Sequence, residues 1–154
     1  LPISKPEIHS KSSAKRFGGK WEDYVEIHKL MDSSKGAMAD NRHRCMTHNA
    51  WFLSEILERI KFHNSTDCKP DGRFYTIINS DGKEISVREI GEQHVLEDFG
   101  MRYIPSAQDY LQEMEMKSWM NNGMGEPPTS FKRLEANKIV KFILLLSCTF
   151  NGFY

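Results

Sequence analysis

The stretch that decides the fold runs from Glu26 to His48 and reads EIHKLMDSSKGAMADNRHRCMTH. It contains three of the chain's six histidines, together with two aspartates and several basic residues. At about 100° per residue, the side chains of His28, Asp32 and Lys35 fall on one stripe of a helix. A polar stripe in a segment that otherwise has helical periodicity predicts a functional site inside a helical bundle.

Composition narrows the class of protein before any motif is considered. The chain has 154 residues, long enough for one domain to bury a core without disulfides. Lys+Arg and Asp+Glu both number 21, and this zero net charge disfavours nucleic acid and anionic membranes as partners. The three cysteines, Cys45, Cys68 and Cys148, form no CxxC pair and indicate free thiols in a reducing cytoplasm. The first 19 residues lack the apolar core of a signal peptide.

Three regions follow from the local composition. Residues 1–20 are rich in Ser, Lys and Gly, so we expect a flexible N-terminal arm that includes His9. Residues 21–120 are predicted to form a helical domain that carries a His/Asp centre. Residues 121–154 begin with a Gly/Pro-rich loop and end in an apolar segment, 139–146, which is too short to span a bilayer. We expect this segment to pack on the domain or to form a homodimer contact.

The first two predicted helices cover residues 21–38 and 40–62. Apolar residues lie along one flank of the first, next to the His28/Asp32/Lys35 stripe. The second has an apolar face and an opposite face that carries Asp40, His43, Arg44 and His48. These two histidines are about 140° apart on a regular helix, so one small ion reaches both only if the helix is distorted. We expect one to be a ligand and the other its partner.

The rest of the domain is predicted from turn and capping signals. Residues 74–78 and 84–87 have strand composition and flank the turn Asn79–Gly82, which indicates a hairpin. Ser86 and Glu89 begin a third helix that ends at Gly100, and Ser106 and Asp109 begin a fourth. The fold class is therefore mainly α, a compact helical bundle with a small β-hairpin between the second and third helices.

Two histidine–aspartate pairs at i, i+4 spacing indicate a metal site: His28 with Asp32, and His94 with Asp98. A metal needs three or four such groups at one point, and helices supply them readily. The mixed nitrogen and oxygen donors suit a divalent ion, zinc first, with manganese and iron as alternatives. Such an ion lowers the pKa of a bound water and makes it a hydrolytic nucleophile. The predicted ligands are His28, Asp32, His43, His48, His94 and Asp98.

Four charged residues complete the predicted site. Lys35, Arg42 and Arg44 are placed to hold a phosphate or carboxylate. Asp40 is the candidate general base, or else it orients a histidine. None of these spacings is a strict signature in the way that HExxH is, and one His/Asp pair on a helix is more often an ordinary surface contact. A structural network of the same residues therefore stays open.

Several phrases resemble, in order, a family of small bacterial and tailed-phage proteins that share a domain of unknown function. They are HKLMDSSK (28–35), DNRHR (40–44), HN (48–49), INSDGK (78–83), VREIGEQHVLED (87–98) and IPSAQDYL (104–111). The resemblance covers about residues 20–115 and implies kinship, with a phage or environmental-virus origin. The chain also resembles, less specifically, the HD-type metal phosphohydrolases. It departs from them in one respect: they have an adjacent His-Asp doublet, and this chain has His43-Arg44 in its place.

The leading functional hypothesis is a metal-dependent hydrolase of a nucleotide or another phosphoester, in the cytoplasm of a bacterium or a phage-infected host. The alternative is a non-catalytic phage accessory protein, in which the same residues form a buried His/Asp/Arg network and the apolar C-terminus binds a second copy or a host protein. A third hypothesis, nucleic-acid binding through residues Lys5 to Lys20 together with Arg42 and Arg44, is disfavoured by the zero net charge.

Overall fold

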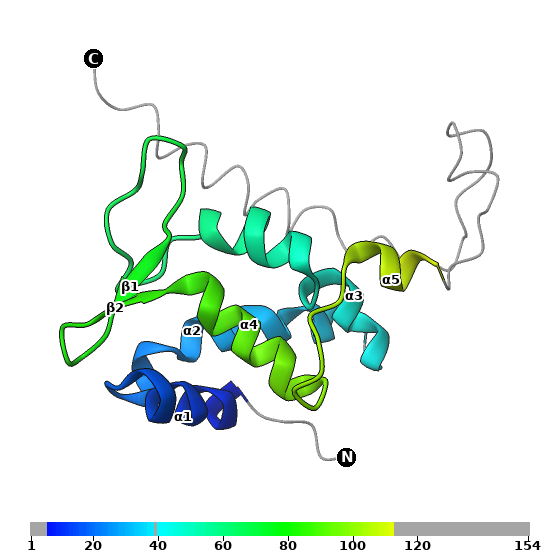
Figure 1. Cartoon of the computed structure of the whole chain (residues 1–154), viewed down its shortest axis with the longest axis horizontal. Helices are drawn as coiled ribbons and strands as arrows, with labels where there is room; N and C mark the ends of the chain where they lie inside the picture. Colours follow the sequence, from blue (N-terminus) through cyan, green and yellow to red (C-terminus); the bar gives the residue numbers. More distant parts are fainter. Residues whose placement is uncertain (1–5, 39, 113–154) are drawn as a thin grey trace. The chain divides into compact units, whose positions relative to one another are not determined.

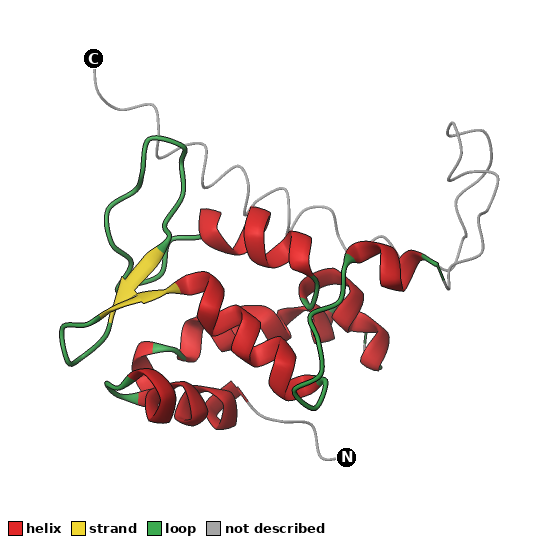
Figure 2. Ribbon diagram, in the orientation of Figure 1, coloured by secondary structure: helices red, strands yellow, loops and turns green. Residues whose placement is uncertain are grey.

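The computed structural model describes residues 6–38 and 40–112, and it is mainly helical with one small hairpin, as predicted (Figures 1 and 2). The α-helices are α1 (Pro6–Phe17), α2 (Val25–Asp32), α3 (Arg44–Thr47), α4 (Val87–Asp98) and α5 (Ala107–Leu111). Short 3-10 turns cover Trp21–Asp23, Ser33–Gly36, Asn41–His43 and Leu57–Arg59, and Phe52–Ile56 is π-helical. In these described ranges, no helix has the length and apolar character needed to cross a membrane.

The expected flexible arm is wrong for residues 6–17, which form α1. Its inner face is polar, with His9, Ser10 and Ser13 all buried. In Figure 1 α1 lies beside α4, and side chains of α1 reach both α2 and α4. A helix that buries polar side chains shows no apolar periodicity in its sequence. The polar composition of residues 1–20 therefore predicted a flexible arm instead of α1.

The two long helices predicted for residues 21–38 and 40–62 are each interrupted. The first divides into a 3-10 turn, α2 and a second 3-10 turn. The second breaks at His48, whose backbone leaves the helical region with φ −104° and ψ 51°. Asn49 stabilises the break, because its side chain accepts from the backbone N–H of Phe52 at 2.9 Å and donates to the carbonyl of Cys45 at 2.8 Å.

The predicted hairpin and third helix are confirmed. Strands β1 (Thr76–Ile78) and β2 (Glu84–Ser86) pair antiparallel, with Ile77 opposite Ile85. Gly82 has φ +75° in the turn, a conformation that glycine adopts without strain. The Ser86 hydroxyl then accepts from the N–H of Glu89 and caps α4.

The apolar core joins α2, the helical residues 52–59, the hairpin and α4. Its fully buried members include Tyr24, Ile27, Met31, Leu53, Leu57, Ile77, Val87, Ile90 and Val95. Along α4, Ile90, His94 and Asp98 follow at four-residue spacing and so form one stripe. The apolar core therefore holds α4 in place, and the stripe of α4 that enters the core through Ile90 also carries the polar residues His94 and Asp98.

The capping box that begins the fourth predicted helix is also confirmed, with Ser106 and Asp109 at the start of α5. The loop before it contacts the break in the second predicted helix, since Ala50 N–H donates to the carbonyl of Pro105 at 2.8 Å. Residues 113–120 and the apolar segment 139–146 lie outside the described residues, as does Cys148.

Candidate metal centre

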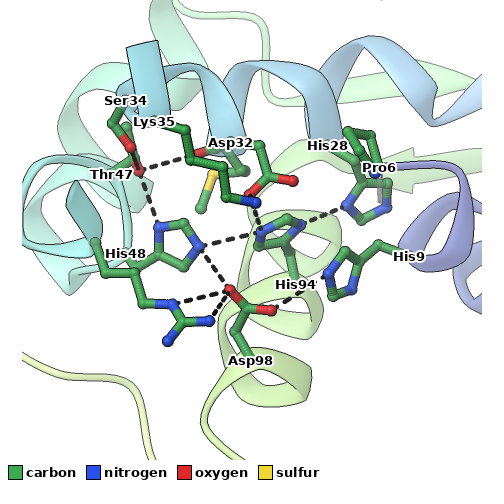
Figure 3. Close-up of polar contacts among 12 residues, drawn as sticks. Pro6, His9, His28, Asp32, Ser34, Lys35, Thr47, His48, His94 and Asp98 are labelled. Atoms are coloured by element: carbon green, nitrogen blue, oxygen red, sulfur yellow. Dashed lines mark hydrogen bonds and ion pairs between the residues drawn. The ribbon is translucent and has the colours of Figure 1, made fainter. Parts of the chain in front are cut away.

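Four of the six predicted ligands meet at one point. Asp32 ends α2, His48 stands at the helix break, and His94 and Asp98 lie one turn apart on α4. One donor atom from each residue lies within 4.8 Å of the donors of the other three. Three segments distant in sequence therefore converge, as Figure 3 shows.

The distances between the donor atoms suit a common small ion. His48 Nε2 lies 3.1 Å from His94 Nε2 and 3.2 Å from Asp98 Oδ2, and His94 Nε2 lies 3.7 Å from Asp32 Oδ1. Bonds of about 2.1 Å in a tetrahedral site place neighbouring donors about 3.4 Å apart. The three separations given above are close to that value, and no two of the four donor atoms are more than 4.8 Å apart.

Asp32 is a buried carboxylate of this cluster whose hydrogen bonding is incomplete. Its carboxylate is buried, and neither oxygen accepts a well-formed hydrogen bond from any residue of the described ranges. Lys35 Nζ lies 2.6 Å from Oδ1 as an ion pair. A buried carboxylate without hydrogen bonds is costly, and a bound ion is one of the ways in which proteins satisfy such a group.

The neighbouring hydrogen bonds leave His48 Nε2 free to act as a ligand. The Thr47 hydroxyl donates its only proton to the carbonyl of Met31 at 2.7 Å. It therefore accepts from His48 Nδ1, 2.9 Å away. In a neutral imidazole the proton on Nδ1 leaves a lone pair on Nε2, which points at His94 and Asp98 (Figure 3).

Burial and charge set the protonation states of the converging side chains. Burial lowers the pKa of His94 to about 4, so this imidazole is neutral at pH 7. Burial raises the pKa of Asp32, but contacts with His94 and Lys35 outweigh it and bring the pKa down to about 2. Burial likewise opposes ionisation of Asp98, yet its contacts with His48 and His9 and the charge of Arg44 hold its pKa well below the ordinary value. Neutral imidazoles and ionised carboxylates are the forms that bind metals.

Two of the predicted cationic residues reach the rim of the cluster. Lys35 pairs with Asp32, and Arg44 pairs with Asp98, with Nη2 3.0 Å from Oδ2. The side chains of Lys35 and Arg44 are 29% and 23% exposed, whereas those of His48 and His94 are completely buried. Both basic groups therefore lie between the buried donors and solvent.

Two predicted ligands take supporting positions instead. His28 contacts His94 through their Nδ1 atoms at 2.9 Å, and its Nε2 lies 2.9 Å from Ser13 Oγ. His43 places Nδ1 2.9 Å from the hydroxyl of Ser34, and its ring packs edge-on against His48. Of these two histidines, His48 is among the converging donors and His43 is not, and the assignment of one as a ligand and the other as its partner stays a prediction.

The structure does not support Asp40 as the general base. Its carboxylate is half exposed and caps the turn that begins at Asn41, where it accepts from the backbone and guanidinium of Arg42. The helix was expected to present Asp40 on the same face as His43, but Asp40 precedes the helix and is held by its own neighbour.

Sequence reasoning missed His9, which was assigned to the tail. Its Nδ1 contacts Glu97 at 2.6 Å, its Nε2 lies 3.3 Å from Asp98 Oδ1, and its ring centroid is 4.1 Å from that of His94. Burial lowers the pKa of His9, but the two carboxylates outweigh it and raise the pKa to about 9. Glu97, which was not among the predicted site residues, is thus part of the same network. The signals for α1 were local: Pro6 and Glu7 at its start and Lys15 and Arg16 in its last turn.

Comparison with known proteins identifies the family of the chain but gives no chemical activity. No curated protein and no solved structure matches the chain. The family described as Domain of unknown function (DUF6915) matches residues 4–120, a range that includes α1 and every residue of the cluster. Because this match covers more than half of the sequence, the chain belongs to the DUF6915 family.

Proposed function

We propose that the protein is a metal-dependent hydrolase that acts on a phosphate-containing substrate, with Asp32, His48, His94 and Asp98 as the ligands of one divalent ion. The observation that carries the proposal is the convergence of these four donors around a buried carboxylate that lacks hydrogen bonds. Zinc suits two imidazoles and two carboxylates, and manganese and iron are the alternatives. A bound ion of this kind supplies a water of lowered pKa as the nucleophile.

The charges at the centre favour an anionic substrate. Two carboxylates neutralise a divalent ion, which leaves the charges of Lys35 and Arg44 without full compensation. The His9 imidazolium is already balanced by Glu97. Lys35 and Arg44 lie at the partly exposed rim, and guanidinium and ammonium groups are the usual partners of phosphate. They would orient a phosphoester above the ion.

Two further parts of this proposal concern origin and place of action. The similarity to the HD-type enzymes contributes only the reaction class to this proposal. The pair His43-Arg44 does not act as a His-Asp doublet here, because His43 contacts Ser34 and Arg44 contacts Asp98. We place the activity in the cytoplasm of a bacterium or a phage-infected cell. The free thiols Cys45 and Cys68 support a reducing compartment.

The proposal is tested by elemental analysis of tag-free protein purified without chelator, followed by assays with nitrophenyl phosphates, phosphodiesters and nucleotides. We expect about one equivalent of zinc, manganese or iron, and turnover that EDTA removes and the same metal restores. No stoichiometric binding after reconstitution with any of the three ions would overturn the proposal, as would metal-bound protein that turns over none of these substrates.

Lys35→Gln tests the anion site separately from the metal. Lys35 contacts a proposed ligand but supplies no donor to the ion, so the variant should keep its equivalent of metal. Loss of one charge-assisted contact should raise KM for the phosphoester about tenfold. Arg42→Gln is the matched control, because Arg42 pairs only with Asp40 at the surface. Equal KM values for the two variants would remove Lys35 from the substrate site.

A second candidate function is favoured by the pairing of each carboxylate. Asp32 with Lys35, Asp98 with Arg44 and Glu97 with His9 make a network that is balanced without any ion. Such a network would serve a non-catalytic accessory protein that acts as a homodimer or binds a host protein. The predicted dimer contact is the apolar segment 139–146, outside the described residues. Light scattering of the full chain should give twice the monomer mass, and Leu144→Asp/Leu145→Asp should return it to the monomer.

A further inference from the structure

We infer that α1 sets the tautomer of the ligand histidine His94 through Ser13 and His28, and thereby strengthens metal binding at the centre. The inference rests on the proposed metal site, but its first part concerns the metal-free protein. Ser13 and His28 are positioning residues, because they act on the ion only through His94.

The relay begins at Gln93, whose amide orientation is fixed by a carboxylate. The amide Nε2 donates to Glu97 Oε1 at 2.8 Å and to Ser12 Oγ at 3.0 Å, which uses both of its protons. Gln93 Oε1 therefore faces Ser13, and the Ser13 hydroxyl donates to it at 3.4 Å. The only proton of that hydroxyl is then used.

The orientation of Ser13 determines the two histidines that follow. Because its hydroxyl proton points to Gln93, Ser13 Oγ accepts from His28 Nε2, 2.9 Å away. His28 is completely buried and forms no ion pair with a carboxylate of the described ranges, so the ring is neutral and carries one proton. His28 Nδ1 then presents a lone pair to His94 Nδ1 at 2.9 Å, and His94 must donate.

A proton on His94 Nδ1 leaves the lone pair of Nε2 inside the cluster. That atom is the one that lies 3.1 Å from His48 Nε2 and 3.7 Å from Asp32 Oδ1 (Figure 3). Ser13, His28 and His94 are all completely buried, so water does not take the place of a lost partner. Two independent hydrogen-bond chains, from Thr47 to His48 and from Ser13 to His94, thus aim two lone pairs at the same point.

The tautomer is measured directly by long-range ¹H–¹⁵N correlation spectra of the metal-free protein at neutral pH, with resonances assigned by histidine substitution. Wild type should show His94 protonated on Nδ1. Ser13→Ala removes the acceptor of His28 Nε2, so His94 should become a mixture of tautomers and the affinity for Zn²⁺ should fall about 10- to 100-fold. Zn²⁺ affinity is measured by competition with a chromophoric chelator.

The matched control is Ser10→Ala, since Ser10 is equally buried on the same helix but donates only to the carbonyl of Pro6 at 2.7 Å. It should leave both the tautomer and the affinity unchanged. His28→Asn keeps an acceptor near the position of Nδ1 and should retain more affinity than His28→Leu, which keeps none. Thermal unfolding of each variant by circular dichroism separates loss of the relay from loss of the fold.

The outcomes distinguish this inference from the proposed function. If wild type binds none of the three metals, the proposed function fails, and with it the claim about affinity, while the tautomer measurement still decides the relay. A His94 ring protonated on Nε2 in wild type overturns the relay. Equal Zn²⁺ affinities for Ser13→Ala and Ser10→Ala overturn its effect on the metal.

Discussion

Asp32→Asn is expected to weaken Zn²⁺ or Mn²⁺ binding more than 100-fold without lowering the stability of the metal-free protein. The amide keeps the shape of the side chain but loses the negative charge, and loss of a direct ligand should exceed the 10- to 100-fold effect of a supporting residue. Affinity is measured by isothermal titration calorimetry, and stability by chemical unfolding in EDTA.

The stability part follows from the surroundings of the carboxylate. Asp32 and Asp98 bring donor atoms within 4.8 Å, and two like charges at that distance repel each other when no cation lies between them. Neither Asp32 oxygen has a well-formed hydrogen bond to lose. The ion pair with Lys35 is partly exposed, and such pairs contribute about 1 kcal/mol or less.

The matched control is Asp40→Asn. Asp40 also has a pKa lowered to about 2, through hydrogen bonds with Arg42, but it lies at the surface and away from the cluster. Its metal affinity and turnover should equal those of wild type. If instead Asp32→Asn costs about 3–5 kcal/mol of stability, as breaking a buried ion pair does, and wild type binds no metal, the structural network is the correct interpretation.

The elements that the sequence predicted well are those with local causes. The hairpin required only strand composition on both sides of a turn with Gly82, and α4 required Ser86 as its N-cap. Asp32, His94 and Asp98 were found because spacing along a helix determines which side chains share a face. The fold class and most of the donor set therefore followed from short-range patterns.

The parts that were missed depend on contacts between distant residues. His9 meets Glu97 across 88 positions, and no pattern within α1 indicates that partner. The expectation for His43 and His48 assumed a continuous helix, whereas the side chain of Asn49 ends one helical segment and begins the next. Which of the two histidines enters the cluster is decided by that break.

The same dependence on packing explains why His28 is not in the converging donor set despite its i, i+4 spacing from Asp32. His28 lies within α2 and faces α1, where Ser13 Oγ contacts its Nε2. Asp32 is the last residue of α2 and faces Lys35 and His94 instead. His28 therefore contacts His94 and stays outside the donor set, because α1, which was predicted to be a flexible arm, lies beside it.

Gly91→Val is expected to destabilise the protein by about 3 kcal/mol, measured by urea unfolding. A Cβ at this position would lie 2.6 Å from Leu57 Cδ2 and 2.7 Å from Leu53 Cδ2, far inside van der Waals contact. Both leucines are fully buried, so they have no open space to move into. Adding methyl groups to a filled core typically costs about 1–3 kcal/mol, and valine also fits a helix less well than most residues.

Gly36→Ala is the matched control, because no atom lies within 4 Å of its added Cβ, and it should stabilise the protein by about 0.4–1 kcal/mol. Gly91 precedes His94 by one turn of α4 and lets α4 pack closely against Leu53 and Leu57. We expect this close packing to determine how near His94 and Asp98 lie to Asp32. In the fraction of Gly91→Val that remains folded, Zn²⁺ affinity should therefore fall as well. Wild-type affinity in a destabilised Gly91→Val protein would show that the centre is held by α1 and α2 without the close packing of α4, and would contradict this coupling.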